Sequence, residues 1–208
     1  MKLTQILSGV VSGLPCILMG ARLALVWKDP LRYEKGRWVR LGVGIMVMEF
    51  IVVHSGMMMA GYLQKINKPD YGIAPLIIML LVYALFVVTI SLGFKSRSLM
   101  ISFASIIAGR FTAFALSPSG ANAFVFMQSA VSMSLYMLAV ILSLTGLPRL
   151  GITEALAKDL MKGSGSGLWV EKPHRAIGAA AFYFFALGLA DILFLTWFDP
   201  HGFTALFK

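Results

Sequence analysis

Apolar residues follow one another along this chain in runs of about twenty, separated by short polar stretches. A helix that crosses a bilayer needs about 20 such residues, whereas barrel strands show ten-residue segments of alternating polarity. The pattern therefore predicts an all-α, polytopic membrane helix bundle, in which one transmembrane domain covers residues 1–208. Its six transmembrane helices are expected at residues 4–27, 41–63, 73–94, 98–116, 123–146 and 176–198.

The composition supports a bilayer rather than water as the solvent of this fold. Of the 208 residues, 59% are hydrophobic and 13% are charged, against about 45–50% and about 25% in soluble domains. An aqueous core of this size cannot bury that much apolar surface. Helices satisfy their own backbone hydrogen bonds in lipid, which is why they are the elements expected here.

The net charge of +9 is concentrated in three of the predicted loops. Cytoplasmic loops carry an excess of Lys and Arg, so we expect these loops in the cytoplasm and both termini outside, in a bacterial-type cytoplasmic membrane. The charge then marks topology and contact with anionic lipid, and nucleic acid is not an expected partner. The loops hold Lys28, Arg32, Lys35, Arg37, Arg40, Lys95, Arg97, Arg149, Lys158, Lys162, Lys172 and Arg175, and the opposite side holds Lys2, Lys65, Lys68 and Lys208.

The longest basic loop contains its own helix and linker, over residues 152–170. Thr153 is a suitable N-cap, because its hydroxyl can accept from the first free backbone N–H groups. Ile152, Leu156 and Leu160 recur at spacing four and give the helix one apolar side. We expect this amphipathic helix to lie on the cytoplasmic membrane surface, followed by a flexible GSGSG linker.

Polar residues inside the apolar runs are the candidate functional site. Ionisable groups at the centre of a membrane span cost about 2.5–3.5 kcal/mol each on insertion scales, so they pair, line a wet cavity or carry a function. The fifth run is the least apolar and adds a glutamine to the ionisable residues. The candidate buried polar site comprises Glu49, His54, Arg110, Asp191, Arg22 and Gln128.

Depth divides these residues into two sets. A rise of about 1.5 Å per residue puts Arg22 and Glu49 within about 12 Å of the cytoplasmic end of their spans. The same count puts His54, Arg110 and Asp191 at about 18–23 Å. These depths allow Arg22 to pair with Glu49, and the three deeper residues to meet one another. The alternatives are that Arg22 extends to lipid phosphates, and that Arg110 and Asp191 form a purely structural ion pair.

These features favour a small transporter-like protein that handles an ion, a proton or a small solute. The main alternative is a non-catalytic accessory subunit that packs against a larger membrane complex, or against copies of itself. We expect no enzyme activity and no cofactor. Copper or haem through His54 is a further alternative, because His54, Met57 and Met58 share a helix face and imidazole and thioether both bind Cu(I).

Overall fold

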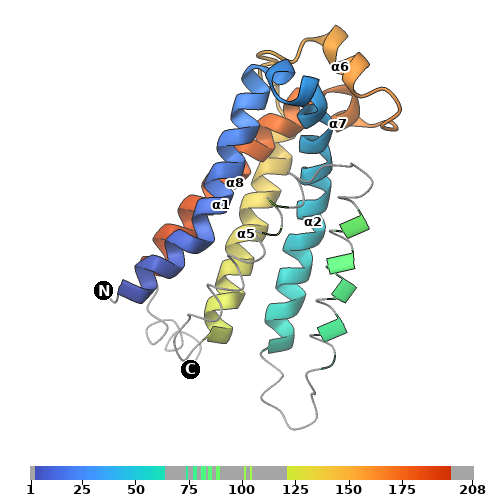
Figure 1. Cartoon of the computed structure of the whole chain (residues 1–208). Helices are drawn as coiled ribbons and strands as arrows, with labels where there is room; N and C mark the ends of the chain where they lie inside the picture. Colours follow the sequence, from blue (N-terminus) through green and yellow to red (C-terminus); the bar gives the residue numbers. More distant parts are fainter. Residues whose placement is uncertain are drawn as a thin grey trace. The chain divides into compact units, whose positions relative to one another are not determined.

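The computed structural model describes residues 3–63 and 121–197, together with isolated positions between them. Those positions, 74, 77–78, 81–82, 84–85, 88–89, 101 and 104, are all helical. The described residues form helices and contain no strand, which confirms the all-α class. The labelled helices of Figure 1 are α1 (Leu3–Lys28), α2 (Arg37–Leu63), α5 (Ala121–Leu144), α6 (Glu154–Leu160), α7 (Leu168–Glu171) and α8 (Pro173–Trp197).

Four predicted spans coincide with long helices, namely α1, α2, α5 and α8. The start of α2 at Arg37 is earlier than predicted, because long basic side chains can reach water while their backbone is helical. Pro173 begins α8 three residues early, since its fixed φ suits the first helical position. The other two predicted spans, 73–94 and 98–116, lie mostly outside the described residues.

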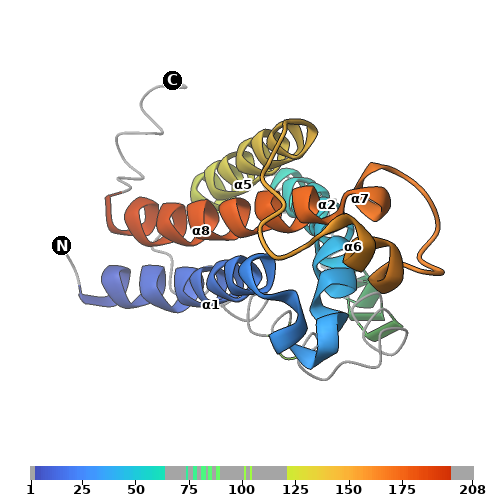
Figure 2. The ribbon, with the colours of Figure 1, turned by 90° about the horizontal axis from the view of Figure 1, so that it is seen from above.

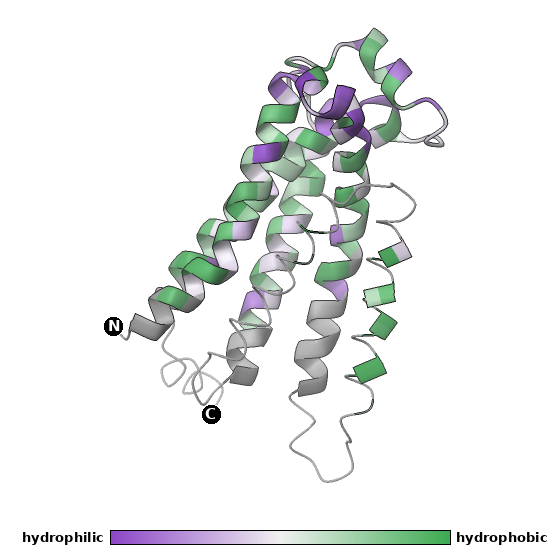
Figure 3. Ribbon diagram, viewed as in Figure 1, coloured by the Kyte–Doolittle hydropathy of each residue, from purple (hydrophilic) through white to green (hydrophobic). Residues whose placement is uncertain are grey.

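Three of these helices are long and apolar enough to cross a membrane, which indicates a membrane protein. They are Gly9–Lys28 within α1, Met127–Leu144 within α5 and Pro173–Leu193 within α8. Figure 3 shows these helices as mostly hydrophobic, with isolated hydrophilic positions, whereas α6 and the loops beside it are rich in hydrophilic residues.

The chain divides into two compact units, and each long helix contributes to both. The first unit comprises Met1–Pro15, Val52–Met133 and Gly188–Lys208. Within it α1 packs closely on α8: a Cβ added to Gly13 would collide with the Gly188 carbonyl oxygen and the Ile192 side chain.

The second unit comprises Cys16–Ile51 and Ser134–Leu187. Tyr183 is at the centre of its aromatic packing, with ring centroids 5.7 Å from Tyr136 and 5.1 Å from Phe184, both edge-on. Edge-to-face pairs of this kind contribute about 0.5–1.5 kcal/mol beyond the burial of their area. The largest fully buried side chains of the unit are Trp38, Tyr183, Phe184, Leu23, Leu41, Ile45, Met46, Met48 and Ile152.

The two longest basic loops are hydrogen-bonded to each other in the second unit. The Gly151 N–H donates to the Trp27 carbonyl over 3.1 Å, and the Trp27 indole donates to the Pro148 carbonyl over 2.9 Å. Arg40 Nη2 donates to the Leu160 carbonyl over 2.8 Å, at the C-terminal end of α6. The loops 28–40 and 147–175 therefore lie at the same end of this unit, as the count of basic residues predicts.

The N-cap predicted for α6 is confirmed, because the Thr153 hydroxyl accepts from the Leu156 N–H over 3.4 Å. On the predicted apolar side, Ile152 is buried within the protein, whereas Leu156 and Leu160 are half-buried. The position of this helix on the membrane surface stays a prediction.

The GSGSG segment that follows α6 is non-helical, as predicted, and its glycines have a structural reason. Gly163, Gly165 and Gly167 have φ values of 79°, 88° and 125°, a range in which other residues are strained. Trp169 in α7 then donates to the buried Ser143 hydroxyl over 2.9 Å, which fixes the far end of the linker to α5.

In the second unit, α1 again packs against α8 through a small residue. A Cβ at Gly20 would lie 2.9 Å from the Phe185 backbone N and 3.1 Å from the Ala181 carbonyl oxygen. Figure 2 shows α1 and α8 side by side, in agreement with these contacts. Small residues allow such close approach of helices, and dispersion contacts then stabilise the pair in lipid.

We expect Gly20→Ala to lower stability by about 1–3 kcal/mol, because the added methyl meets backbone atoms that cannot move aside. This loss outweighs the gain in helix propensity, which is at most about 1 kcal/mol. Thermal unfolding in mild detergent measures the difference. Gly146→Ala is the matched control, because a Cβ there has no heavy atom within 4 Å. Equal midpoints for both variants would contradict the packing of α1 on α8.

Candidate functional site

Asp191 is the centre of a polar cluster among the described residues of the first unit. Its side chain is buried in α8, with 2% exposure. The Ser12 hydroxyl of α1 donates to Oδ2 over 3.0 Å, and the Gln128 amide of α5 donates to Oδ1 over 2.9 Å. Three helices thus direct polar groups to one carboxyl, and each of its oxygens accepts a neutral donor.

The local sequence explains how Ser12 reaches Asp191. Ser12 is next to Gly13, whose missing side chain permits the close approach of α1 to the Gly188 carbonyl of α8. Asp191 is three residues beyond Gly188, so both lie on the same side of α8. The Ser132 hydroxyl donates to the Gln128 carbonyl over 2.9 Å, which leaves the Gln128 side chain for Asp191.

This site combines a carboxyl group with a hydroxyl and an amide as hydrogen-bond donors. A carboxyl group is the kind of side chain that proton transfer and cation binding both use. The same three side chains carry the oxygen atoms that small hard cations prefer, if the amide turns its carbonyl toward the centre. Both functions need the carboxylate of Asp191, whereas Ser12 and Gln128 orient it and share its charge.

Glu49 is the buried carboxyl of the second unit, with no exposed surface. The Tyr183 hydroxyl of α8 donates to Glu49 Oε1 over 2.6 Å, a length typical of hydroxyl donors to carboxylates. Beside them, the Tyr136 hydroxyl donates to the Met46 carbonyl over 2.9 Å. Glu49 therefore faces protein rather than lipid.

Arg22 does not pair with Glu49, which corrects the predicted pairing. Its guanidinium carbon lies 4.3 Å from the Tyr33 ring centroid and 4.8 Å from that of Trp38. Among the described ion pairs, none joins Arg22 to Glu49. Trp38 precedes Glu49 by eleven residues, or about 16 Å along α2, so the arginine reaches toward the loop and away from the carboxyl.

The remaining predicted residues are described in part. His54 is half-buried in α2, in the sequence range of the first unit. Arg110 lies outside the described residues, so its meeting with Asp191 stays a prediction. The Met57 and Met58 side chains are not described either, and the copper or haem alternative therefore stays a prediction. Within the described ranges, no three His, Cys, Asp or Glu side chains form a metal-binding group.

Sequence reasoning missed Ser12, Tyr136 and Tyr183 as members of the polar groups. Their signal is weak, because serine and tyrosine are tolerated in apolar helices and often satisfy themselves locally. For Ser12, the neighbouring Gly13 marks a face where helices approach. For Tyr183, the signal is a polar tip that needs a partner when it is buried within an apolar helix.

Comparison with known proteins gives no relative: no family model, no curated protein and no solved structure is significantly similar to this chain. The arguments below therefore depend on the geometry of the described residues.

We expect Tyr183→Phe to destabilise the protein by about 1–3 kcal/mol, because it removes a donor from a carboxylate oxygen in a dry interior. Tyr136→Phe is the matched control. It should cost less, about 0.5–1.5 kcal/mol, because the oxygen that it affects is a helix carbonyl. Thermal unfolding of both variants, alone and with Glu49→Gln, measures the coupling. If Tyr183→Phe lowers the stability equally with and without Glu49→Gln, the two side chains are not coupled, which would contradict the hydrogen bond between them.

Proposed function

We propose that this chain is a multi-pass protein of a bacterial-type cytoplasmic membrane that moves protons or a small cation by way of Asp191. The observation that carries the proposal is the contact of Asp191 with Ser12 and Gln128, which brings side chains from α1, α5 and α8 together. Two of the six residues that the sequence marks as a polar site, Gln128 and Asp191, are thus direct neighbours.

The energy of burial supports a functional reading of Asp191. An aspartate costs about 2.5–3.5 kcal/mol at the centre of a membrane helix on insertion scales and less toward the end, where Asp191 lies; such residues typically mark proton relays and ion pathways. The hydrogen bonds from Ser12 and Gln128 offset part of this cost. An acidic side chain can exchange a proton or bind a cation, which a neutral side chain cannot do in the same way.

His54 and Arg110 extend this proposal as predicted members of the same site. Histidine changes its charge near neutral pH and could pass a proton to or from Asp191. Arginine keeps its charge and could hold the aspartate in its ionised form between transfers. The sequence ranges of both residues belong to the unit that contains Asp191.

The proposed topology has six spans, with both termini outside the cytoplasm. The contacts between the loops 28–40 and 147–175 support the placement of these two basic loops on one side. The bias of Lys and Arg then favours the cytoplasm for that side.

The transport proposal predicts that purified wild-type protein in liposomes dissipates an imposed gradient of protons or of Na⁺, followed with an internal dye. We expect Asp191→Asn to reduce the rate to that of protein-free liposomes, because the amide cannot exchange a proton or carry charge. Asp191→Glu should retain part of the rate. Asp29→Asn is the matched control, since it makes the same chemical change on an exposed loop.

A wild-type rate that Asp191→Asn leaves unchanged would contradict the role of Asp191. A wild-type protein without any flux, which co-purifies with other membrane proteins, would contradict transport and support the accessory-subunit alternative.

The topology predicts that alkaline phosphatase fused to the C-terminus is active, because this enzyme folds only outside the cytoplasm. A fusion of green fluorescent protein at the same residue should be dark. The control is a pair of fusions in the basic loop after Gly165, where the two reporters should behave in the opposite way. A fluorescent C-terminal fusion would reverse the orientation.

A further inference from the structure

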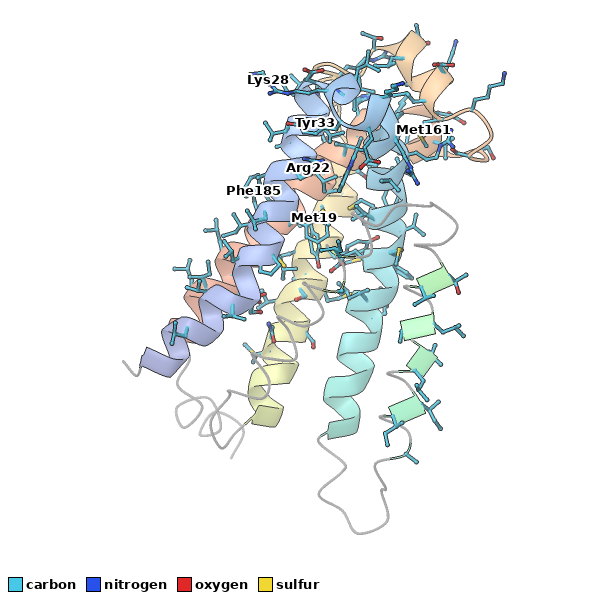
Figure 4. All side chains as sticks on the ribbon, in the orientation of Figure 1. Met19, Arg22, Lys28, Tyr33, Met161 and Phe185 are labelled. Carbon is cyan, nitrogen blue, oxygen red and sulfur yellow. The ribbon has the colours of Figure 1, made fainter. Side chains whose placement is uncertain are left out.

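Arg22 makes cation–π contacts with two aromatic rings in the second unit. Its guanidinium carbon lies 4.3 Å from the Tyr33 ring centroid and 4.8 Å from the Trp38 ring centroid, and Figure 4 shows Arg22 beside Tyr33. A cation–π contact does not replace the hydrogen bonds that the guanidinium N–H groups can donate. Among the hydrogen bonds of the described residues, none has Arg22 as its donor, and its buried Nε has no acceptor.

The other half-buried arginines of this unit each have at least one acceptor, although the Nε of Arg175 is buried without one, as in Arg22. Arg175 Nη1 donates to the Leu144 carbonyl over 3.2 Å, and Arg37 lies 3.6 Å from Glu34. Glu34 also accepts from the Trp38 indole over 3.1 Å, so the carboxylate nearest to the stacked rings is engaged by other donors. The half-buried Arg22 has a buried Nε without an acceptor, and no described carboxylate forms an ion pair with it. An anion would supply the missing acceptor and offset the cost of this partial burial.

The position of Arg22 near the end of α1 indicates which kind of anion can reach its side chain. It lies six residues before the end of α1, or about 9 Å, and its side chain reaches toward the loop that contains Tyr33. An arginine this close to a helix end can extend its side chain to the membrane interface, where phosphate groups lie. The exposed residues Lys28, Arg32 and Lys35 surround the loop with positive charge, which attracts anions.

We propose that Arg22, in contact with the rings of Tyr33 and Trp38, binds the phosphate group of a ligand at the loop end of the second unit. The fork of guanidinium N–H groups matches two phosphate oxygens in one plane. A membrane phospholipid and a free phosphate compound both carry this group. The site is independent of Asp191, so this proposal and the transport proposal can fail separately.

The test uses the full-length protein in mild detergent and measures binding of phosphatidylglycerol by native mass spectrometry and by the shift of the unfolding temperature. Phosphatidylglycerol should bind and stabilise the wild-type protein. Arg22→Gln should bind it at least about tenfold more weakly, because charge-assisted hydrogen bonds are lost. Arg22→Lys keeps the positive charge but lacks the planar guanidinium group. This variant should therefore also bind phosphatidylglycerol more weakly than the wild type does. Arg32→Gln, which removes one exposed charge from the same loop, is the matched control and should bind as the wild type does.

Inorganic phosphate distinguishes the two sources of the ligand. If it does not compete with phosphatidylglycerol, the site takes a lipid headgroup; if it competes and stabilises the wild type but not Arg22→Gln, the site takes free phosphate as well. Equal binding of phosphatidylglycerol by the wild type, Arg22→Gln and Arg22→Lys would overturn the proposal. An equal loss in Arg32→Gln would overturn it too, since general attraction to the basic loop would then explain the binding.

Discussion

The close packing of α1 against α8 is the constraint on which the described structure depends. At Gly13 and Gly20 the backbone of α1 approaches α8 so nearly that a single methyl group meets backbone atoms. Lipid supplies no hydrophobic force between helices, so contact of this quality is what holds them together. The same approach brings the Ser12 hydroxyl to Asp191. The hydrogen bond between Ser12 and Asp191 therefore depends on the close packing of the helices. The two side chains are within reach only because the neighbouring glycine has no side chain to hold α1 away from α8.

The helices follow largely from the pattern of apolar residues, and their ends follow from local chemistry. The first and last described long helices begin and end within about three residues of the predicted positions, since a continuous apolar run leaves the backbone no other way to satisfy itself. The amphipathic helix α6 shows where this reasoning stops. Its pattern requires a cover for one side, but the pattern is the same whether the cover is lipid or protein.

The polar sites were predictable as a set, but their pairings were not. The depth counted along the backbone indicated that Arg22 lies near the level of Glu49. An arginine side chain is long, however, and here it extends toward the loop and away from that level. The tyrosine that satisfies Glu49 gave no distinct signal, because tyrosine is common in apolar helices. Gln128 and Asp191 were identified as members of a site from their polarity alone, while their contact depends on how α5 and α8 pack.

The hydrogen bond between Ser12 and Asp191 also bears on how the protein assembles during its synthesis. The two residues are 179 positions apart, and a ribosome that adds about 5–20 residues per second needs roughly 9–36 s to pass from one to the other. During that interval α1 is already made, and its narrow glycine face and its serine have no native partner. Helix α1 must therefore wait in the membrane, or beside an insertion factor, until α8 is made.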